Sequence, residues 1–385
     1  MTGKTDGKRR QISRRLVLFF PGFEPLGAEQ HRARFERALQ KTGPVYGSQF
    51  SATGLSTRAT GVSGFSVSGS GAGWKTNTDI AIFDWSTLLD HFAQRPIPVR
   101  FASGMAALVM LILNGTLLRY LKTSWRYGFF FFYPLFLLAV CVLAGLAASA
   151  VFQSTAFSLV AWFVVFSAGI FLFTRKAHLL LMMDDWAFAA RLARGGDPVI
   201  EKMGQQLASA MQAEMNHDTD EILVVGHSLG CVFAVDALAK TETPAKLPVG
   251  LLTTGSSLLK IVLDERAQWL RDSTKGVAEK GGLWLEIQTL NDVISFYRSN
   301  PAAAAGALSA IGLKVVRIEF RKMLLPQTYR RVKFNLFRTH RQFVLAAERP
   351  YFYSLHEIAC GPDPFDLVWK SNGLPDFVRP LREQK

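Results

Sequence analysis

The stretch at 221–240 constrains the fold more than any other part of the chain, and it reads EILVVGHSLGCVFAVDALAK. Residues 222–225 form a short, β-branched, apolar run, which is typical of a strand buried on both faces. After the sequence GHSLG, apolar residues recur at helical spacing, namely Cys231, Val232, Ala234, Val235 and Leu238. The stretch therefore predicts a strand, a tight turn and a helix in direct succession.

Ser228 stands at the centre of this turn, between Gly226 and Gly230. A sharp turn lifts the serine hydroxyl clear of the sheet, and the flanking residues must be glycine because the strand and helix backbones pass too close for a Cβ. The pattern resembles the nucleophile elbow of the α/β-hydrolase superfamily, and His227-Ser228-Leu229 is similar to its lipase and esterase members. The other interpretation is a glycine-rich turn whose serine only caps the helix.

The resemblance implies a mostly parallel sheet with helices on both faces, and a Ser, Asp or Glu, His order along the chain. It also implies an oxyanion-hole loop after an earlier strand. Residues 16–20 read as a buried strand that ends in Pro21-Gly22-Phe23, which is similar to the oxyanion loop of lipases. The backbone N–H groups of Phe23 and Leu229 would be the two donors, each contributing roughly 3–4 kcal/mol in the transition state. An ordinary strand-to-helix turn is the alternative.

A serine nucleophile needs a base, and the base needs an acid to orient it. Asp292 follows the apolar run at 283–287 and is the expected acid, with Asp264 as the alternative. Only two histidines follow Asp292, which are His340 and His356. We expect His340 to be the base because it follows an alternating run at 331–337 that is interpreted as the last strand. His227, beside the serine, is expected to pack behind the turn.

Two long uncharged runs, 129–152 and 155–174, interrupt the pattern of strands and helices. As helices they would be about 36 Å and about 30 Å long, enough to cross a bilayer twice as a tight hairpin. A third apolar run at 101–121 is predicted to be an interfacial or re-entrant helix at the membrane surface, because Phe23 and Ser228 can share a site only if the number of crossings is even. Basic residues flank the hairpin on its outer sides and are absent between the runs, which by the positive-inside rule places both flanks in the cytoplasm: Arg119, Lys122, Arg126, Arg175 and Lys176.

These features divide the chain into an N-terminal hydrolase part at 1–100, a membrane insertion at 101–180 and a C-terminal hydrolase part at 181–385. The net charge is +14, with 44 basic and 30 acidic residues, which suits anionic lipid headgroups. A nucleic-acid partner is not expected, since no nucleic-acid-binding motif accompanies the charge. The three cysteines fit neither a disulfide framework nor a zinc site, and neither a metal nor another cofactor is expected.

The sequence thus predicts a membrane-anchored serine hydrolase that cleaves a lipid or other acyl ester through an acyl-enzyme. We expect an integral protein of the bacterial inner membrane whose catalytic domain faces the cytoplasm. A non-catalytic membrane scaffold with the same fold and an acyltransferase with the same triad are the alternatives. Substrate headgroup, chain length and oligomeric state are not predicted.

Overall fold

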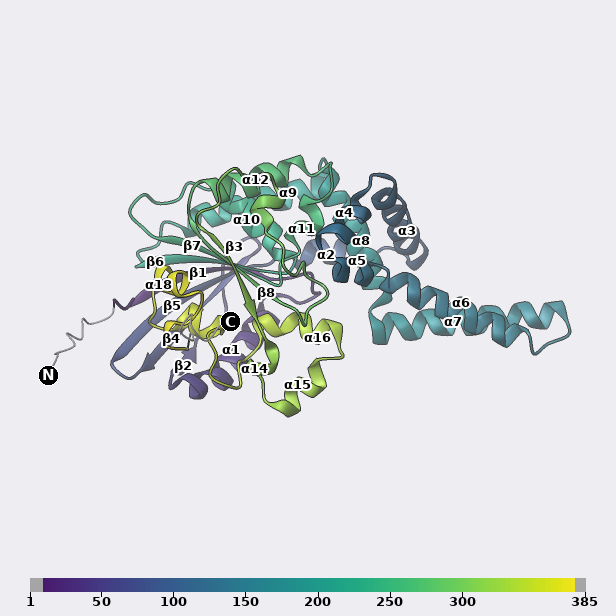
Figure 1. The fold of residues 1–385 in the computed structure, drawn as a ribbon, viewed down its shortest axis with the longest axis horizontal. Helices are drawn as coiled ribbons and strands as arrows, with labels where there is room; N and C mark the ends of the chain where they lie inside the picture. The colour runs from purple at the N-terminus through teal and green to yellow at the C-terminus, as the bar shows by residue number, and fades with distance from the viewer. Residues whose placement is uncertain (1–9, 378–385) are drawn as a thin grey trace.

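The computed structural model describes residues 10–377 and is built on one nine-stranded sheet (Figure 1). The predicted domain limits at residues 1 and 385 lie outside this range. The strand order is β2-β4-β5-β1-β6-β7-β8-β9, and β3 pairs with β4. The strands are β1 (Arg14–Phe20), β2 (Gln49–Ala52), β3 (Ser56–Ala59), β4 (Val62–Gly71), β5 (Trp74–Phe83), β6 (Glu221–His227), β7 (Val249–Thr254), β8 (Leu283–Thr289) and β9 (Leu313–Ile318).

The six strands from β5 to β9 in this order are parallel to their neighbours, whereas β2, β3 and β4 add an antiparallel edge. Strand β1 lies between β5 and β6, so that Leu18 pairs with Ala81 on one side and Val224 on the other. The prediction of a mostly parallel α/β sheet is confirmed.

Helices cover both faces of the sheet because the central strands are apolar on both faces. Leu18 and Val224 belong to one core, beneath α8 (Leu179–Arg194), α9 (Pro198–Glu214), α10 (Gly230–Lys240) and α12 (Gln268–Glu279). Val17 and Leu223, one residue earlier on the same strands, belong to the opposite core, beneath α1 (Ala28–Tyr46), α17 (Leu355–Cys360) and α18 (Phe365–Ser371). Alternate residues of each strand therefore hold the two helical layers.

The remaining helices are short or belong to the membrane insertion. They are α2 (Ser86–Ala93), α3 (Ile97–Leu113), α4 (Thr116–Thr123), α5 (Trp125–Phe131), α6 (Tyr133–Ser149), α7 (Thr155–Ala177), α11 (Leu258–Val262), α13 (Pro301–Ala304), α14 (Phe320–Met323), α15 (Pro326–Val332), α16 (Leu336–Arg341) and the 3-10 turns η1 (Gln342–Val344) and η2 (Pro375–Phe377).

Two helical segments are long and apolar enough to cross a membrane, as predicted: Trp125–Ser149, which combines α5 and α6, and Thr155–Ala177, which is α7. In Figure 1 the antiparallel pair α6 and α7 extends away from the sheet and its helices. Helix α7 buries none of its residues within the protein. It packs along α6 and leaves apolar side chains such as Phe157 and Phe163 exposed, which suits a lipid environment better than water.

The third apolar run is broken into α3 and α4, because Gly115 adopts a left-handed backbone conformation (φ 71°) at their junction. Helix α3 packs against α8 through Gly104, whose Cα lies close to Met183. Its other side exposes apolar residues, including Val109, Ile112 and Leu113. Together with α2, from which it is bent by 107°, it is also long and apolar enough for a broken span or a re-entrant loop, so the interfacial position stays a prediction.

The prediction of a last strand at 331–337 is wrong. The last strand is β9, at Leu313–Ile318, and residues 331–337 contain the end of α15 and the start of α16. Alternation of Val332, Phe334 and Leu336 imitates a strand, but the Asn335 side chain accepts a hydrogen bond from the backbone N–H of Arg338 and caps a helix there.

Candidate active site

Ser228 lies between the end of β6 and the start of α10, at the carboxyl edge of the parallel strands. Its backbone has φ 54°, a left-handed conformation that is costly for a non-glycine residue. The two flanking residues must be glycine because other backbone atoms lie too close to them to leave room for a Cβ. A Cβ on Gly226 would lie 2.8 Å from the Cα of Cys231, and a Cβ on Gly230 would lie 2.2 Å from the carbonyl oxygen of Pro21. The expected tight turn is therefore present.

The loop after β1 lies directly against this turn. A Cβ on Gly22 would be 3.0 Å from the Cβ of Ser228. Phe23 and Leu229, the two expected oxyanion donors, both line the cavity that contains Ser228. The structure thus brings together the two backbone segments that the sequence assigned to an oxyanion hole. Burial of Trp85 supports the loop, since its indole N–H donates to the carbonyl oxygen of Pro21 over 3.0 Å.

Asp292 and His340 form a buried hydrogen-bonded pair. Asp292 follows β8, His340 lies on α16, and the distance from His340 Nδ1 to Asp292 Oδ2 is 2.8 Å. Burial opposes ionisation of Asp292, but the charge and hydrogen bond of His340 and further hydrogen bonds hold its pKa below the usual value. An ionised acceptor at Nδ1 places the proton on that nitrogen and leaves Nε2 as the basic atom.

The Nε2 atom of His340 is buried and has no hydrogen-bond partner within the described range 10–377. His340 and Ser228 line the same cavity. The hydroxyl of Ser228 lies 3.4 Å from the hydroxyl of Ser257. The Ser228 hydroxyl is thus engaged with Ser257, while the unpaired nitrogen of His340 belongs to the same cavity lining.

His227 connects the turn to the histidine-bearing helix. Its Nε2–H donates to the backbone carbonyl of His340 over 3.3 Å, and the two rings lie 5.1 Å apart. Burial, together with the nearby positive charge of His340, lowers the pKa of His227 to about 3. His227 is therefore neutral, and it lines the cavity beside His340 rather than lying wholly behind the turn.

The two alternative residues lie outside this arrangement. Asp264 is held by Arg266, whose Nη2 lies 2.6 Å from its Oδ2, and it does not line the cavity. His356 is fully buried in the opposite core, with its ring 4.6 Å from the ring of Phe35. Neither of its ring nitrogens has a hydrogen-bond partner in the part of the chain that the structure describes.

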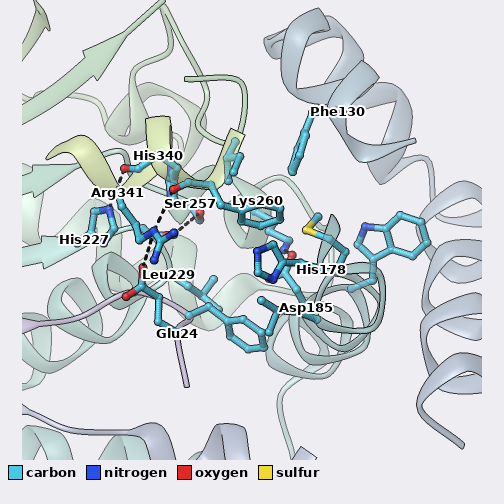
Figure 2. Close-up of a pocket in the computed structure, with 18 of the residues that line it drawn as sticks. Glu24, Phe130, His178, Asp185, His227, Leu229, Ser257, Lys260, His340 and Arg341 are labelled. Carbon is cyan, nitrogen blue, oxygen red and sulfur yellow. Dashed lines mark hydrogen bonds and ion pairs between the residues drawn. The ribbon is translucent and has the colours of Figure 1, made fainter. Parts of the chain in front are cut away.

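The cavity around Ser228 has a volume of about 270 Å³ and a mostly apolar lining. Many of its apolar residues come from α5, α8 and α16, and these include Phe130, Phe131, Met182, Trp186 and Phe337. Figure 2 shows His340, Arg341 and His227 on one side of this space, with Phe130 on a separate helix across from them. The floor is thus formed by the sheet edge and one wall by the base of the membrane insertion.

The charged residues of the lining are paired with one another. Lys260 forms an ion pair with Asp185, and the backbone carbonyl of Lys260 accepts a 2.5 Å hydrogen bond from Tyr120. Arg341 lies 3.7 Å from Glu24, in the loop after β1. Because each charge has a partner, the cavity favours a neutral, largely apolar ligand.

Sequence reasoning did not identify Ser257, Lys260, Asp185 or the Glu24–Arg341 pair as parts of the site. Ser257 had a usable signal, since it follows a parallel strand at the sheet edge where ligands bind. Lys260 and Asp185 had none, because they are brought together by the packing of α8 against α11.

Among residues 10–377 there is no group of three His, Cys, Asp or Glu side chains that could hold a metal ion. The chain matches no protein-family profile, no curated protein sequence and no solved structure.

Proposed function

We propose that the protein is a membrane-anchored serine hydrolase of the α/β-hydrolase type that cleaves a lipid or other acyl ester. The single observation that carries this proposal is the position of Ser228. It has a strained backbone at the end of a central parallel strand, and it lines a cavity together with His340, whose ring is hydrogen-bonded to the buried Asp292. A serine that only capped α10 would not require this backbone conformation.

In the proposed reaction, Ser228 Oγ attacks the ester carbonyl while Nε2 of His340 accepts its proton. The negative charge on Asp292 stabilises the resulting imidazolium. The carbonyl oxygen, now negatively charged, is held by the backbone N–H groups of Phe23 and Leu229. His340 then returns the proton to the leaving alcohol, and water releases the acid from Ser228 in a second, equivalent round.

The apolar, charge-balanced cavity supports an acyl group as the part of the substrate that binds there. The two candidate spans support a lipid as its source, since they hold the site beside a hydrocarbon phase. The net charge of +14 supports binding to anionic headgroups. We further propose that the sheet and its site lie in the cytoplasm of a bacterial cell, on the basis of the basic flanks of the hairpin.

A serine-directed fluorophosphonate tests this proposal. The wild-type chain should be labelled covalently, and Ser228→Ala should not be labelled although it is still inserted into the membrane. Ser257→Ala is the matched control, because it removes the neighbouring hydroxyl in the same cavity and should leave labelling in place. Labelling of Ser228→Ala, or loss of labelling in Ser257→Ala alone, would reject Ser228 as the nucleophile.

A further inference from the structure

The cavity around Ser228 has a second space directly behind one of its walls. This space is an open groove of about 540 Å³ at the base of the first candidate span. Phe130 lines both spaces. Val293 and Leu336 line the groove, whereas their chain neighbours Ile294 and Phe337 line the cavity. The wall between the two spaces is therefore a single layer of side chains.

The groove lies where the membrane surface is expected. Its lining is aromatic, and Trp125, Phe129 and Phe136 expose 63%, 66% and 64% of their surfaces. Aromatic residues at the end of a membrane-spanning helix are typical of the boundary between headgroups and hydrocarbon. These rings are exposed on this side of the span, and in a bilayer the groups that meet them are lipid acyl chains.

Phe130 is the side chain that lines both spaces, and it is buried, with 8% of its surface exposed. Its ring contacts are with Tyr127 and Tyr133 of the same helical segment, at 6.3 and 6.1 Å. By contrast, the ring of Tyr127 lies 4.0 Å from Phe296 and the ring of Phe131 lies 4.7 Å from Trp186. Phe130 belongs to the same packed cluster as these rings, so joining the cavity to the groove would require its rotamer to change within that cluster.

The size of the cavity also requires an extension. At about 270 Å³ it is at the lower end of the ~300–1,000 Å³ range of small-molecule sites. It therefore accommodates the ester and the beginning of an acyl chain, and the remainder of a long chain must lie beyond the wall. The groove is the continuation that the structure offers.

We propose that the substrate is a long-chain lipid ester that reaches Ser228 sideways from the bilayer, with its acyl chain passing the wall at Phe130 and lying in the groove. This inference rests on the proposed hydrolase function and specifies its substrate class and route. Phe130 determines specificity in this arrangement: it admits the chain of a membrane lipid and plays no part in the reaction of a short ester that fits inside the cavity.

The test uses the full chain reconstituted in phosphatidylcholine vesicles. One substrate is a fluorogenic long-chain diacyl phospholipid embedded in the vesicles, and the other is water-soluble p-nitrophenyl butyrate. Phe130→Trp fills the passage and should lower kcat/KM for the embedded ester by about tenfold or more, with the butyrate ester changed by less than about twofold. Phe157→Trp is the matched control, because Phe157 is a lipid-facing ring on α7 that is 66% exposed and lines neither space.

Labelling by a small fluorophosphonate at the wild-type rate shows that the Phe130→Trp site is intact. An equal loss on both esters, or no loss on the embedded ester, would overturn the lateral route. A wild-type chain that is labelled and cleaves only the butyrate ester would overturn it as well. If the wild type is neither labelled nor active on either ester, the hydrolase proposal itself fails.

Discussion

His340 and His356 have opposite surroundings although both follow Asp292 in the chain. His340 lines the cavity and has a carboxylate on one nitrogen, whereas His356 is enclosed by apolar side chains that lower its pKa to about 3. An imidazole that stays neutral and has no path to the substrate does not serve as a general base at neutral pH. The difference between them comes from packing and is invisible in their sequence spacing.

We therefore expect His340→Ala to lower turnover of an acyl ester by about 10⁴-fold or more, as for other members of a catalytic triad. His356→Ala should lower stability by roughly 2–4 kcal/mol through a cavity in the core, with turnover per folded molecule kept within about threefold. Activity normalised to the folded fraction in detergent measures both effects. An inactive His356→Ala protein beside an active His340→Ala protein would reverse the assignment.

At the scale of elements, the decisive contact is between the start of α10 and the loop after β1. Gly230 lets the two backbones approach so closely that an added Cβ would lie 2.2 Å from the carbonyl oxygen of Pro21 and 2.3 Å from that of Phe20. Phe23 is positioned against the nucleophile turn by this approach. A substitution at Gly230 would therefore alter the geometry around Ser228 without removing any functional group.

Gly230→Ala is accordingly expected to abolish fluorophosphonate labelling or to prevent folding. The added Cβ would clash with the backbone carbonyl oxygens of Pro21 and Phe20, which cannot move away as a flexible side chain could. Gly276→Ala is the matched control: a Cβ there meets nothing within 4 Å, and in a helix the change should stabilise by roughly 0.5–1 kcal/mol. Thermal unfolding in detergent and the labelling rate are the two measurements. A Gly230→Ala protein with wild-type labelling would show that the two backbones can separate without loss of the site.

Local sequence patterns predict most of the strands of the sheet, but they do not predict features that depend on tertiary packing. The elbow strand, its helix and the two membrane-spanning helices were predictable because each has its own apolar periodicity. The alternation at 331–337 was misread, since a two-residue period in a basic segment fits a strand and a capped helix equally well. The cavity wall at Phe130 could not be foreseen, because nothing local indicates that the base of the insertion folds back onto the sheet edge.

At the scale of the whole molecule, the two halves of the sheet lie on the two sides of the membrane insertion in sequence and form one layer in space. Strand β1 pairs with β5, which precedes the insertion, and with β6, which follows it. A single sheet can be built in this way only if both halves are on the same side of the bilayer. Any crossings of the chain between β5 and β6 must therefore be even in number, a condition that two spans, α5–α6 and α7, would meet.

A cysteine introduced at Ser154, at the tip between the spans, should react with an impermeant thiol reagent added to whole cells. Cysteines introduced at Ser13 and Lys280, both exposed on the sheet domain, should react only after lysis. The wild-type chain is the control, because its three cysteines are buried. Labelling of Ser13 and Lys280 from opposite sides would mean an odd number of crossings, and Phe23 and Ser228 would then not share one site.

The place of β1 in the middle of the sheet also determines the order in which parts of the fold can form during translation. When the ribosome has completed β5, β1 has one partner and one open edge, and the strand that closes it is made only after residues 84–220. At ordinary rates of translation this interval is on the order of ten seconds. Throughout that time the nascent chain carries an unpaired strand edge, which is a template for aggregation, while the hairpin is already available to the insertion machinery. If the hairpin inserts during this interval, membrane insertion precedes completion of the sheet, and Ser228 is assembled into its cavity in a chain that is already anchored.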